Sequence, residues 1–150
     1  MIEEGSPFPS FSLPDQDGKV RTLADFEGKK TLFYFYPKDD TSGCTAQACD
    51  LRDSFPKFKG VHVVGVSPDS PKSHRKFIDK YSLPFPLLAD EEKALCEACG
   101  VWVEKSMYGK KYMGVERSSF LVDETGVVTH VWRKVKPAEH AEQVLETLKG

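Results

Sequence analysis

Two apolar runs, separated by about one helix's length of chain, most constrain how this sequence can fold. The first, residues 30–36, ends in four consecutive aromatic residues and is bounded by Gly28 and Pro37. The second, residues 61–66, is mostly valine and stops at Ser67-Pro68-Asp69. Apolar runs of this length without alternation are typical of strands buried on both faces. Because residues 44–55 between them have helical character, the pattern predicts a parallel β-α-β unit.

The remaining elements extend this unit. A helix is expected over residues 72–81, with Phe77, Ile78 and Tyr81 on its inner face, and a short one over residues 91–98. Residues 118–122 and 127–132 flank a turn and predict a hairpin, and a last helix is expected from Pro137 to the end. Residues 11–13 and 20–22 predict an N-terminal hairpin around the turn at 15–18.

This order of elements predicts an α/β, thioredoxin-like fold, in which helices flank a central mixed β-sheet. The N-terminal β-hairpin is an extension of that plan, and an insert precedes the last two strands. No repeat, linker or low-complexity tract interrupts residues 1–150, so we expect a single domain.

Charge and composition limit the partners and the compartment. The net charge of −2 provides no global positive field for nucleic acid or an anionic membrane. The acidic opening, Met1-Ile2-Glu3-Glu4, is followed by no apolar stretch, so neither a signal peptide nor a transmembrane span is expected. The predicted location is the cytoplasm, where the four cysteines are not expected to form permanent disulfides.

The most informative cysteine is Cys44, which follows the first buried strand and a polar loop. It falls in the first turn of the next helix, where unpaired N–H groups and a partial positive charge stabilise a thiolate. A thiolate is the nucleophile, and ligands bind beyond the carboxyl ends of strands in open α/β sheets. The hydroxyl of Thr41 is close enough to bond the sulfur or a substrate oxygen, and Pro37 would shield the thiolate from water. The alternative is a small core cysteine, with Thr41 and Ser42 only capping the helix.

The segment from Tyr34 to Cys49 resembles the peroxiredoxins, because it contains their P-x-x-x-T-x-x-C pattern. A second cysteine five residues after the first, together with the segment from Arg117 to Asp123, is similar to the peroxiredoxin Q (bacterioferritin comigratory protein) branch. The resemblance covers nearly the whole chain, including residues 5–17, 65–67, 87–90 and 100–114.

The resemblance implies a role for each of these residues. Cys44 would be the peroxidatic cysteine, attacking the terminal peroxide oxygen to form a sulfenic acid. Thr41, Arg117 and the backbone N–H groups of Gly43 and Cys44 would bind the two peroxide oxygens, and these bonds would strengthen as charge develops on the leaving oxygen. Without the resemblance, Arg117 could equally be a surface arginine at the start of a strand.

Cys49 would be the resolving cysteine, and its spacing from Cys44 decides whether the two can form a disulfide on an intact helix. On one regular helix the two residues are about 7.5 Å apart along the axis and about 140° apart around it. Their Cα atoms are then roughly 8.6 Å apart, beyond the limit of about 7 Å for a disulfide. A Cys44–Cys49 disulfide therefore requires local unwinding of the helix. The alternative is that Cys49 is an inert, partly buried residue.

The other candidate ligands and thiols form no recognisable site. Cys96 and Cys99 have zinc or redox spacing, but no further ligand pair lies nearby and they close a short helix, which favours buried packing residues. A secondary disulfide or a backup thiol is the alternative. The four histidines have no metal-ligand spacing. Trp102, Tyr108, Tyr112 and Met113 are expected in a loop, where they either wall the active site or pack in the core.

The sequence therefore predicts a thiol-dependent peroxidase for hydrogen peroxide and organic hydroperoxides, with no metal, haem or flavin. Thioredoxin or a similar dithiol protein would reduce the Cys44–Cys49 disulfide, and the protein is expected to act as a monomer. Two alternatives remain: a peroxide-responsive redox sensor or holdase, and a general thiol-disulfide oxidoreductase.

Overall fold

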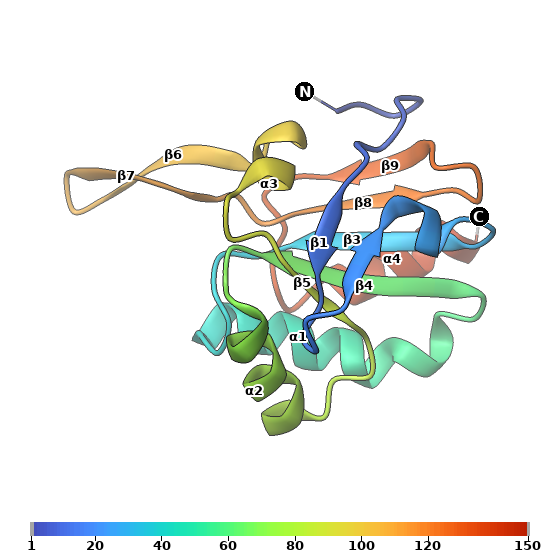
Figure 1. Cartoon of the computed structure of the whole chain (residues 1–150), viewed down its shortest axis with the longest axis horizontal. Helices are drawn as coiled ribbons and strands as arrows, with labels where there is room; N and C mark the ends of the chain where they lie inside the picture. Colours follow the sequence, from blue (N-terminus) through green and yellow to red (C-terminus); the bar gives the residue numbers. More distant parts are fainter. Residues whose placement is uncertain (1, 150) are drawn as a thin grey trace.

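The computed structural model describes residues 2–149 and contains one central sheet of five strands (Figure 1). Its strands lie in the order β5-β4-β3-β8-β9, with β3 and β4 parallel, β4 and β5 parallel, and β8 antiparallel to both β3 and β9. This is the expected thioredoxin-like fold with a mixed sheet. The sheet strands are β3 (Lys30–Phe35), β4 (Val61–Ser67), β5 (Leu87–Ala89), β8 (Ser118–Val122) and β9 (Val128–Trp132).

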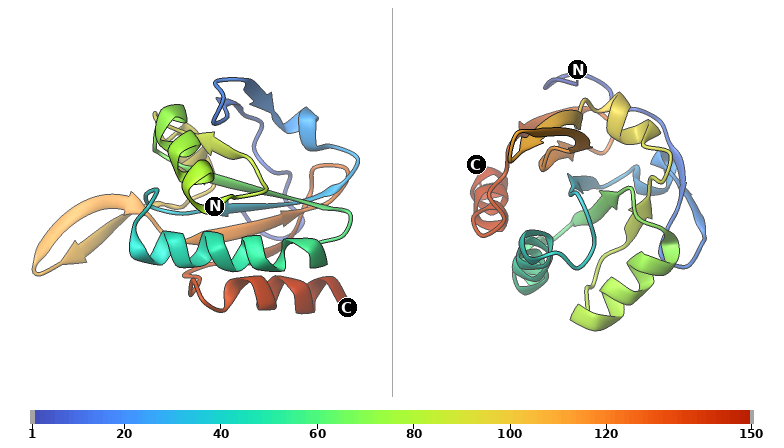
Figure 2. Two further views of the ribbon diagram at one scale, coloured as in Figure 1. Left: turned by 90° about the horizontal axis from the view of Figure 1, so that it is seen from below. Right: turned by 90° about the vertical axis from the view of Figure 1, so that its left-hand side faces the viewer.

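Three helices cover one face of the sheet, and the N-terminal segment covers the other (Figure 2). The helical side has α1 (Ser42–Ser54), α2 (Pro71–Tyr81) and α4 (His140–Lys149), with α1 and α4 packed together. The opposite side has β1 (Ser12–Pro14), β2 (Val20–Thr22), the 3₁₀ turn η1 (Leu23–Phe26) and α3 (Ala94–Ala98). A second 3₁₀ turn, η2 (Phe55–Lys57), follows α1. None of the described helices is both long and apolar enough to cross a membrane.

The apolar run of β3 contributes to the hydrophobic clusters on both faces of the sheet, because successive side chains point to opposite faces. Phe33 and Phe35 pack on the N-terminal side, whereas Leu32, Tyr34 and Tyr36 pack against the helices. All five side chains are at most 1% exposed. The run predicted as a two-sided buried strand is therefore confirmed, with its pairing ending at Phe35.

Two expected helix starts are corrected by the structure. The helix expected over residues 91–98 is only Ala94–Ala98, because Lys93 has a left-handed backbone (φ 62°) that interrupts it. The last helix begins at His140, and Pro137 lies in the turn before it.

The insert before the last two strands forms a hairpin, not a loop. Its strands are β6 (Trp102–Met107) and β7 (Lys110–Val115), which pair only with each other among the described residues. They project from the body beyond the end of the sheet at which α1 begins (Figures 1 and 2). Core packing is wrong for Tyr108, Tyr112 and Met113, which are 96%, 44% and 50% exposed.

Candidate active site

Cys44 is the third residue of α1, in the first turn as predicted, and only 2% of it is exposed. The N–H of Thr45 bonds back to the carbonyl of Thr41 (2.8 Å). The N–H groups of Gly43 and Cys44 precede that bond, so they have no carbonyl four residues back within the helix. The sulfur therefore lies where backbone donors and the helix dipole favour negative charge.

Arg117 reaches this helix start from the segment between β7 and β8. One guanidinium nitrogen, Nη2, lies 3.4 Å from the Sγ atom of Cys44, and the other, Nη1, donates to Oε1 of Gln47 (2.6 Å). Gln47 is fully buried one turn after Cys44, so it fixes the direction of the guanidinium. A Cβ on Gly43 would lie 3.2 Å from Nη2. Glycine at this position therefore lets the cation approach the helix start closely.

Thr41 and Pro37 belong to the loop that joins β3 to α1. Thr41 is the N-cap residue of α1, but its side chain does not cap the helix; its hydroxyl donates to the carbonyl of Lys38 (3.0 Å). The hydroxyl hydrogen is thus committed, while the lone pairs of the oxygen remain able to accept a hydrogen bond from a ligand. Pro37 is half-buried directly after the last aromatic residue of the run.

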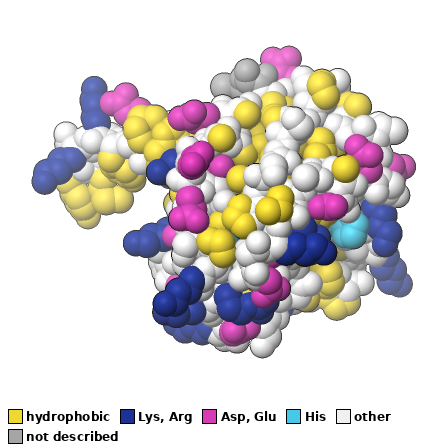
Figure 3. All heavy atoms as spheres, in the orientation of Figure 1, with side chains coloured by type: hydrophobic (Ala, Val, Ile, Leu, Met, Phe, Trp, Pro, Cys, Tyr) yellow, Lys and Arg dark blue, Asp and Glu magenta, His cyan; other side chains and the backbone are white. Residues whose placement is uncertain are grey.

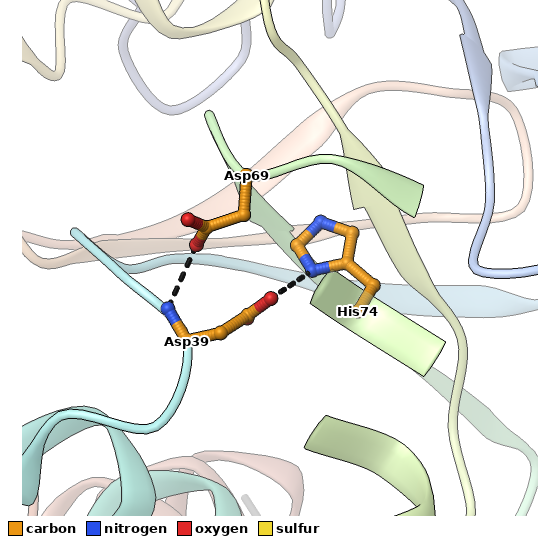
Figure 4. A group of neighbouring side chains, drawn as sticks. All are labelled: Asp39, Asp69 and His74. Carbon is orange, nitrogen blue, oxygen red and sulfur yellow. Dashed lines mark hydrogen bonds and ion pairs between the residues drawn. The ribbon is translucent and has the colours of Figure 1, made fainter. Parts of the chain in front are cut away.

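The loop is anchored to α2 by Asp39, which sequence reasoning did not single out (Figure 4). Its carboxylate accepts bonds from the hydroxyls of Tyr36 (2.6 Å) and Ser73 (2.8 Å) and from Nδ1 of His74 (2.7 Å). Its backbone N–H donates to Asp69 (2.7 Å). These bonds tie the loop to both the carboxyl end of β4 and the first turn of α2.

The hydrogen bonds of His74 decide whether this cluster can bind a metal ion. Nε2 of His74 faces the carbonyl of Leu88 (2.9 Å), and Nδ1 faces the Asp39 carboxylate. Both ring nitrogens of His74 are therefore engaged in hydrogen bonds. A metal ion would need a free nitrogen lone pair. Although Asp39, Asp69 and His74 place their ligand atoms within 4.8 Å of one another, they form a buried hydrogen-bond network and not a metal site.

Asp40 anchors the same loop from outside. Its backbone is left-handed (φ 57°), a conformation that aspartate adopts more readily than most residues. Its carboxylate accepts bonds from Lys80 (2.8 Å) and Tyr81 (2.7 Å) near the end of α2, and these bonds lower its pKa. The loop between β3 and Cys44 is therefore held at two consecutive residues, one buried and one exposed.

Cys49 lies on the same helix as Cys44. α1 runs unbroken through both positions, Cys49 is half-buried, and both thiols are free. The structure thus has the arrangement in which the helix geometry does not permit a disulfide between them.

Comparison with known proteins places this site in a family. Residues 5–131 match the AhpC/TSA family. The chain is 49% identical to a putative peroxiredoxin bcp of Coxiella burnetii and 48% identical to Peroxiredoxin Bcp of Bacillus subtilis, covering 98% and 99% of this chain and 99% and 96% of the relatives. A structure of a Xylella fastidiosa PrxQ cysteine mutant superposes with a TM-score of 0.93 at 36% identity, over 99% of this chain and 96% of that one.

The chain belongs to the Bcp/peroxiredoxin Q branch of the AhpC/TSA peroxiredoxins. It is therefore a thiol peroxidase with a thioredoxin fold.

Within this peroxiredoxin, the other cysteine pair lies on the opposite face of the sheet. Cys96 and Cys99 are fully buried in the core on the N-terminal side, which confirms their prediction as packing residues. Burial raises the pKa of both thiols, and the Asp90 carboxylate raises it further. Asp90 itself accepts the backbone N–H groups of Cys96 (2.8 Å) and Leu95 (3.3 Å). This environment opposes thiolate formation.

The structure brings Arg117 to Cys44 at the helix start, whereas the Thr41 hydroxyl donates to the carbonyl of Lys38 and not to the sulfur. Sequence reasoning missed the residues that support this site. Gln47 could have been found from its position one helical turn after Cys44. Asp39 and His74 are 35 residues apart, and only the fold brings them together. Of the four histidines, His74 and His140 are fully buried and lie in helices.

Proposed function

We propose that this peroxiredoxin reduces hydrogen peroxide and organic hydroperoxides with Cys44 as its nucleophile. The observation that carries the proposal is the Arg117 guanidinium 3.4 Å from the Cys44 sulfur at a helix start. A Xanthomonas campestris bacterioferritin comigratory protein described for its alkyl peroxide reduction activity is 45% identical, with a TM-score of 0.87 over 93% of this chain and 90% of that one. That likeness supports the same substrate class here.

In the first half of the cycle, the Cys44 thiolate attacks the terminal oxygen of the peroxide. The O–O bond breaks and an S–O bond forms. The leaving alkoxide takes up the proton that was lost when the thiol ionised, so the product is an alcohol, or water from hydrogen peroxide. Arg117 and the N–H groups of Gly43 and Cys44 donate to the peroxide oxygens, where negative charge grows. Because the Thr41 hydroxyl already donates to the carbonyl of Lys38, we assign its oxygen as the acceptor of a hydrogen bond from the peroxide O–H. Pro37 limits access of water to the sulfur.

In the second half, the Cys49 thiol attacks the sulfenic sulfur of Cys44. Water leaves and a disulfide forms, so the peroxide has taken two electrons from the two thiols. This step requires the first turns of α1 to unwind, because the intact helix holds the two Cα atoms too far apart. The cycle uses no metal, haem or flavin.

Recycling requires a dithiol reductant, for which we propose thioredoxin. We further propose that residues 1–150 act as a single domain, as a monomer and in the cytoplasm. The reducing compartment supplies the reductant that the cycle consumes, and it keeps the other cysteine pair as thiols.

Three cysteine variants test the proposal by peroxide consumption. Cys44→Ser should abolish turnover, and Cys96→Ser should retain it as the control. Cys49→Ser should complete one turnover with thioredoxin and then stall as a sulfenic acid, detected by dimedone labelling and mass spectrometry. Turnover in Cys44→Ser would refute the proposal, and a stoichiometric reaction in the wild type would favour a redox sensor.

Amide exchange tests the unwinding. After one equivalent of peroxide, exchange should rise across residues 42–50 in the wild type but not in Cys49→Ser. Unchanged protection in the oxidised wild type would contradict local unfolding.

A further inference from the structure

The projecting hairpin, residues 102–115, which we call the arm, has no part in the chemistry above. Its strands are joined by Tyr108 and Gly109, both with positive φ (52° and 79°), as a two-residue hairpin turn requires. Its base is two residues from Arg117, and it extends from the end of the molecule where α1 begins (Figure 2). The arm therefore stands beside the active site.

The pairing register assigns each side chain of the arm to one of two faces. Lys105 lies directly opposite Tyr112, and alternation places Met107 on the same face. Glu104 lies opposite Met113 on the other face. The side chain of Lys105 is packed close to Gly114 near the base, and its pKa is lowered by partial burial and by the Arg117 charge. We call the face with Lys105, Met107 and Tyr112 the inner face, because its Lys105 lies within the electrostatic influence of Arg117 and Cys44.

The arm exposes several large apolar side chains to solvent. Met107 and Tyr112 on the inner face are 56% and 44% exposed, and Tyr108 at the tip is 96% exposed. Figure 3 shows this apolar surface on the projecting hairpin with lysines beside it. Exposed methionine and tyrosine side chains suit contact with a protein partner, because methionine adapts its shape and tyrosine combines apolar area with a polar tip.

The charge of the arm distinguishes between the proteins that could bind to it. The arm carries Lys105, Lys110 and Lys111 against one acid, Glu104, whereas the whole chain has a net charge of −2. Two copies docked arm to arm would oppose like charges across a symmetric interface. A partner with an acidic surface would instead be attracted to the arm and guided toward Cys44.

We propose that the inner face of the arm docks the dithiol protein that reduces the Cys44–Cys49 disulfide, and that this partner carries acidic side chains around its reactive thiols. The inference rests on the proposed recycling of that disulfide. A small apolar contact with a charged rim is suited to a transient redox encounter, which belongs to the smallest class of protein interfaces.

The redox step explains why docking beside the active site matters. A thiolate of the partner attacks one sulfur of the Cys44–Cys49 disulfide, forming a mixed disulfide and releasing the other cysteine as a thiol. The partner's second thiol then displaces the remaining cysteine. Two electrons and two protons pass to this chain, and the partner leaves as a disulfide. The partner must approach in one orientation, which an adjacent apolar surface provides.

The experiment uses thioredoxin as the probe and compares residues from the two faces of the arm. In Met107→Ser/Tyr112→Ser, kcat/KM for thioredoxin should fall at least tenfold. Met113→Ser removes a side chain of similar exposure from the other face, and kcat/KM should stay within twofold of the wild type. Stopped-flow oxidation by hydrogen peroxide and turnover driven by dithiothreitol should also stay within twofold in both variants.

A charge variant adds a second measurement. Lys105→Glu/Lys110→Glu should lower kcat/KM for thioredoxin several-fold at low ionic strength, and the difference from wild type should shrink as salt is added. An equal salt dependence in both proteins would contradict an acidic partner.

The remaining outcomes separate this inference from the proposed function. If thioredoxin serves the wild type and Met107→Ser/Tyr112→Ser equally, the arm is not the docking surface, although the proposed function stands. If oxidation by peroxide slows in that variant, the arm belongs to peroxide binding instead. If sedimentation shows a wild-type dimer that the variant loses, the occupant is a second copy. If dithiothreitol supports turnover of the wild type but thioredoxin does not, both the proposed reductant and the docking inference fail.

Discussion

The loop that carries the active-site residues and the arm beside it are held in opposite ways. The loop is fixed by Asp39, which is 8% exposed and accepts three hydrogen bonds, two of them from α2. The arm is fixed only at its base, and among the described residues its two strands pair with no third strand.

The difference follows from what each region has to do. Atoms that attack or stabilise a peroxide must hold their positions closely, since small displacements cost large factors in rate. A surface that receives another protein must stay accessible, so it cannot be covered by the molecule's own core. The predictions below test whether substitutions at the active-site loop and its surroundings change the reaction rate and the stability more than substitutions in the arm do.

The largest effect is expected at Arg117, where the two regions join. In Arg117→Lys, one ammonium cannot reach both Gln47 and the Cys44 sulfur, so oxidation of Cys44 by peroxide should slow by about 100- to 1000-fold, or about 3 to 4 kcal/mol. Stopped-flow kinetics measures this. Arg133→Lys, which changes an arginine bound to backbone carbonyls of Ile2 and Cys99, is the control. A loss of less than tenfold in Arg117→Lys would show that the guanidinium geometry is not essential.

The next effect concerns the buried anchor. Asp39→Asn removes the buried carboxylate that accepts hydrogen bonds from Tyr36, Ser73 and His74, so the free energy of unfolding should fall by about 3 kcal/mol in urea titrations. Asp40→Asn is the matched control one residue away; its bonds to Lys80 and Tyr81 are exposed, and the loss should be much smaller. Equal losses would mean that burial does not distinguish the two anchors.

A third effect is a pH dependence of stability that arises in the body of the protein and not in the arm. His140, at the start of α4, is fully buried, and this burial lowers its pKa to about 4. In the unfolded chain histidine titrates near 6.5, so its contribution to stability is complete above about pH 6.5 and is lost as the pH falls toward 4. Between pH 7.5 and pH 5 the wild type should lose about 2 kcal/mol more than His140→Phe. Parallel stability curves for the two proteins would contradict this.

The smallest effect compares two tyrosine hydroxyls, one in each region. Tyr36→Phe removes a donor to the Asp39 carboxylate, so it should cost about 1.5 kcal/mol of unfolding free energy. Tyr108→Phe removes a hydroxyl at the exposed tip of the arm and should change stability by less than about 0.5 kcal/mol. Thermal unfolding of the two variants side by side measures the contrast, and a larger loss in Tyr108→Phe would reverse the comparison.

The sequence predicted the parts of the structure whose signals are local. The run at residues 30–36 is apolar on both faces, and Cys44 follows it within one loop, so both the central strand and the helix start were recognisable. The arm was missed because lysines and a glutamate interrupt its apolar residues, so neither strand has a regular apolar face. β5 has three residues, too few to show a period.

Within the site, the limit was sequence separation. Thr41 and Gly43 are near Cys44 in the chain, whereas Arg117 entered only through the resemblance to peroxiredoxins. The bonds of Asp39 to Ser73 and His74 depend on how α2 packs beside the end of β4. No local pattern encodes that packing, so these partners could only be found in three dimensions.

The central sheet also partitions the sulfur chemistry of the molecule. The proposed reactive pair, Cys44 and Cys49, lies along α1, and Cys96 and Cys99 lie in the core on the other face of the sheet. Thiol-disulfide exchange needs direct contact between sulfur atoms, so a layer of paired strands insulates one pair from the other. In the proposed cycle, an oxidised Cys44 would therefore be shielded from exchange with the other thiols of its own chain, and its oxidising equivalent would pass only to Cys49 or to a molecule arriving from outside.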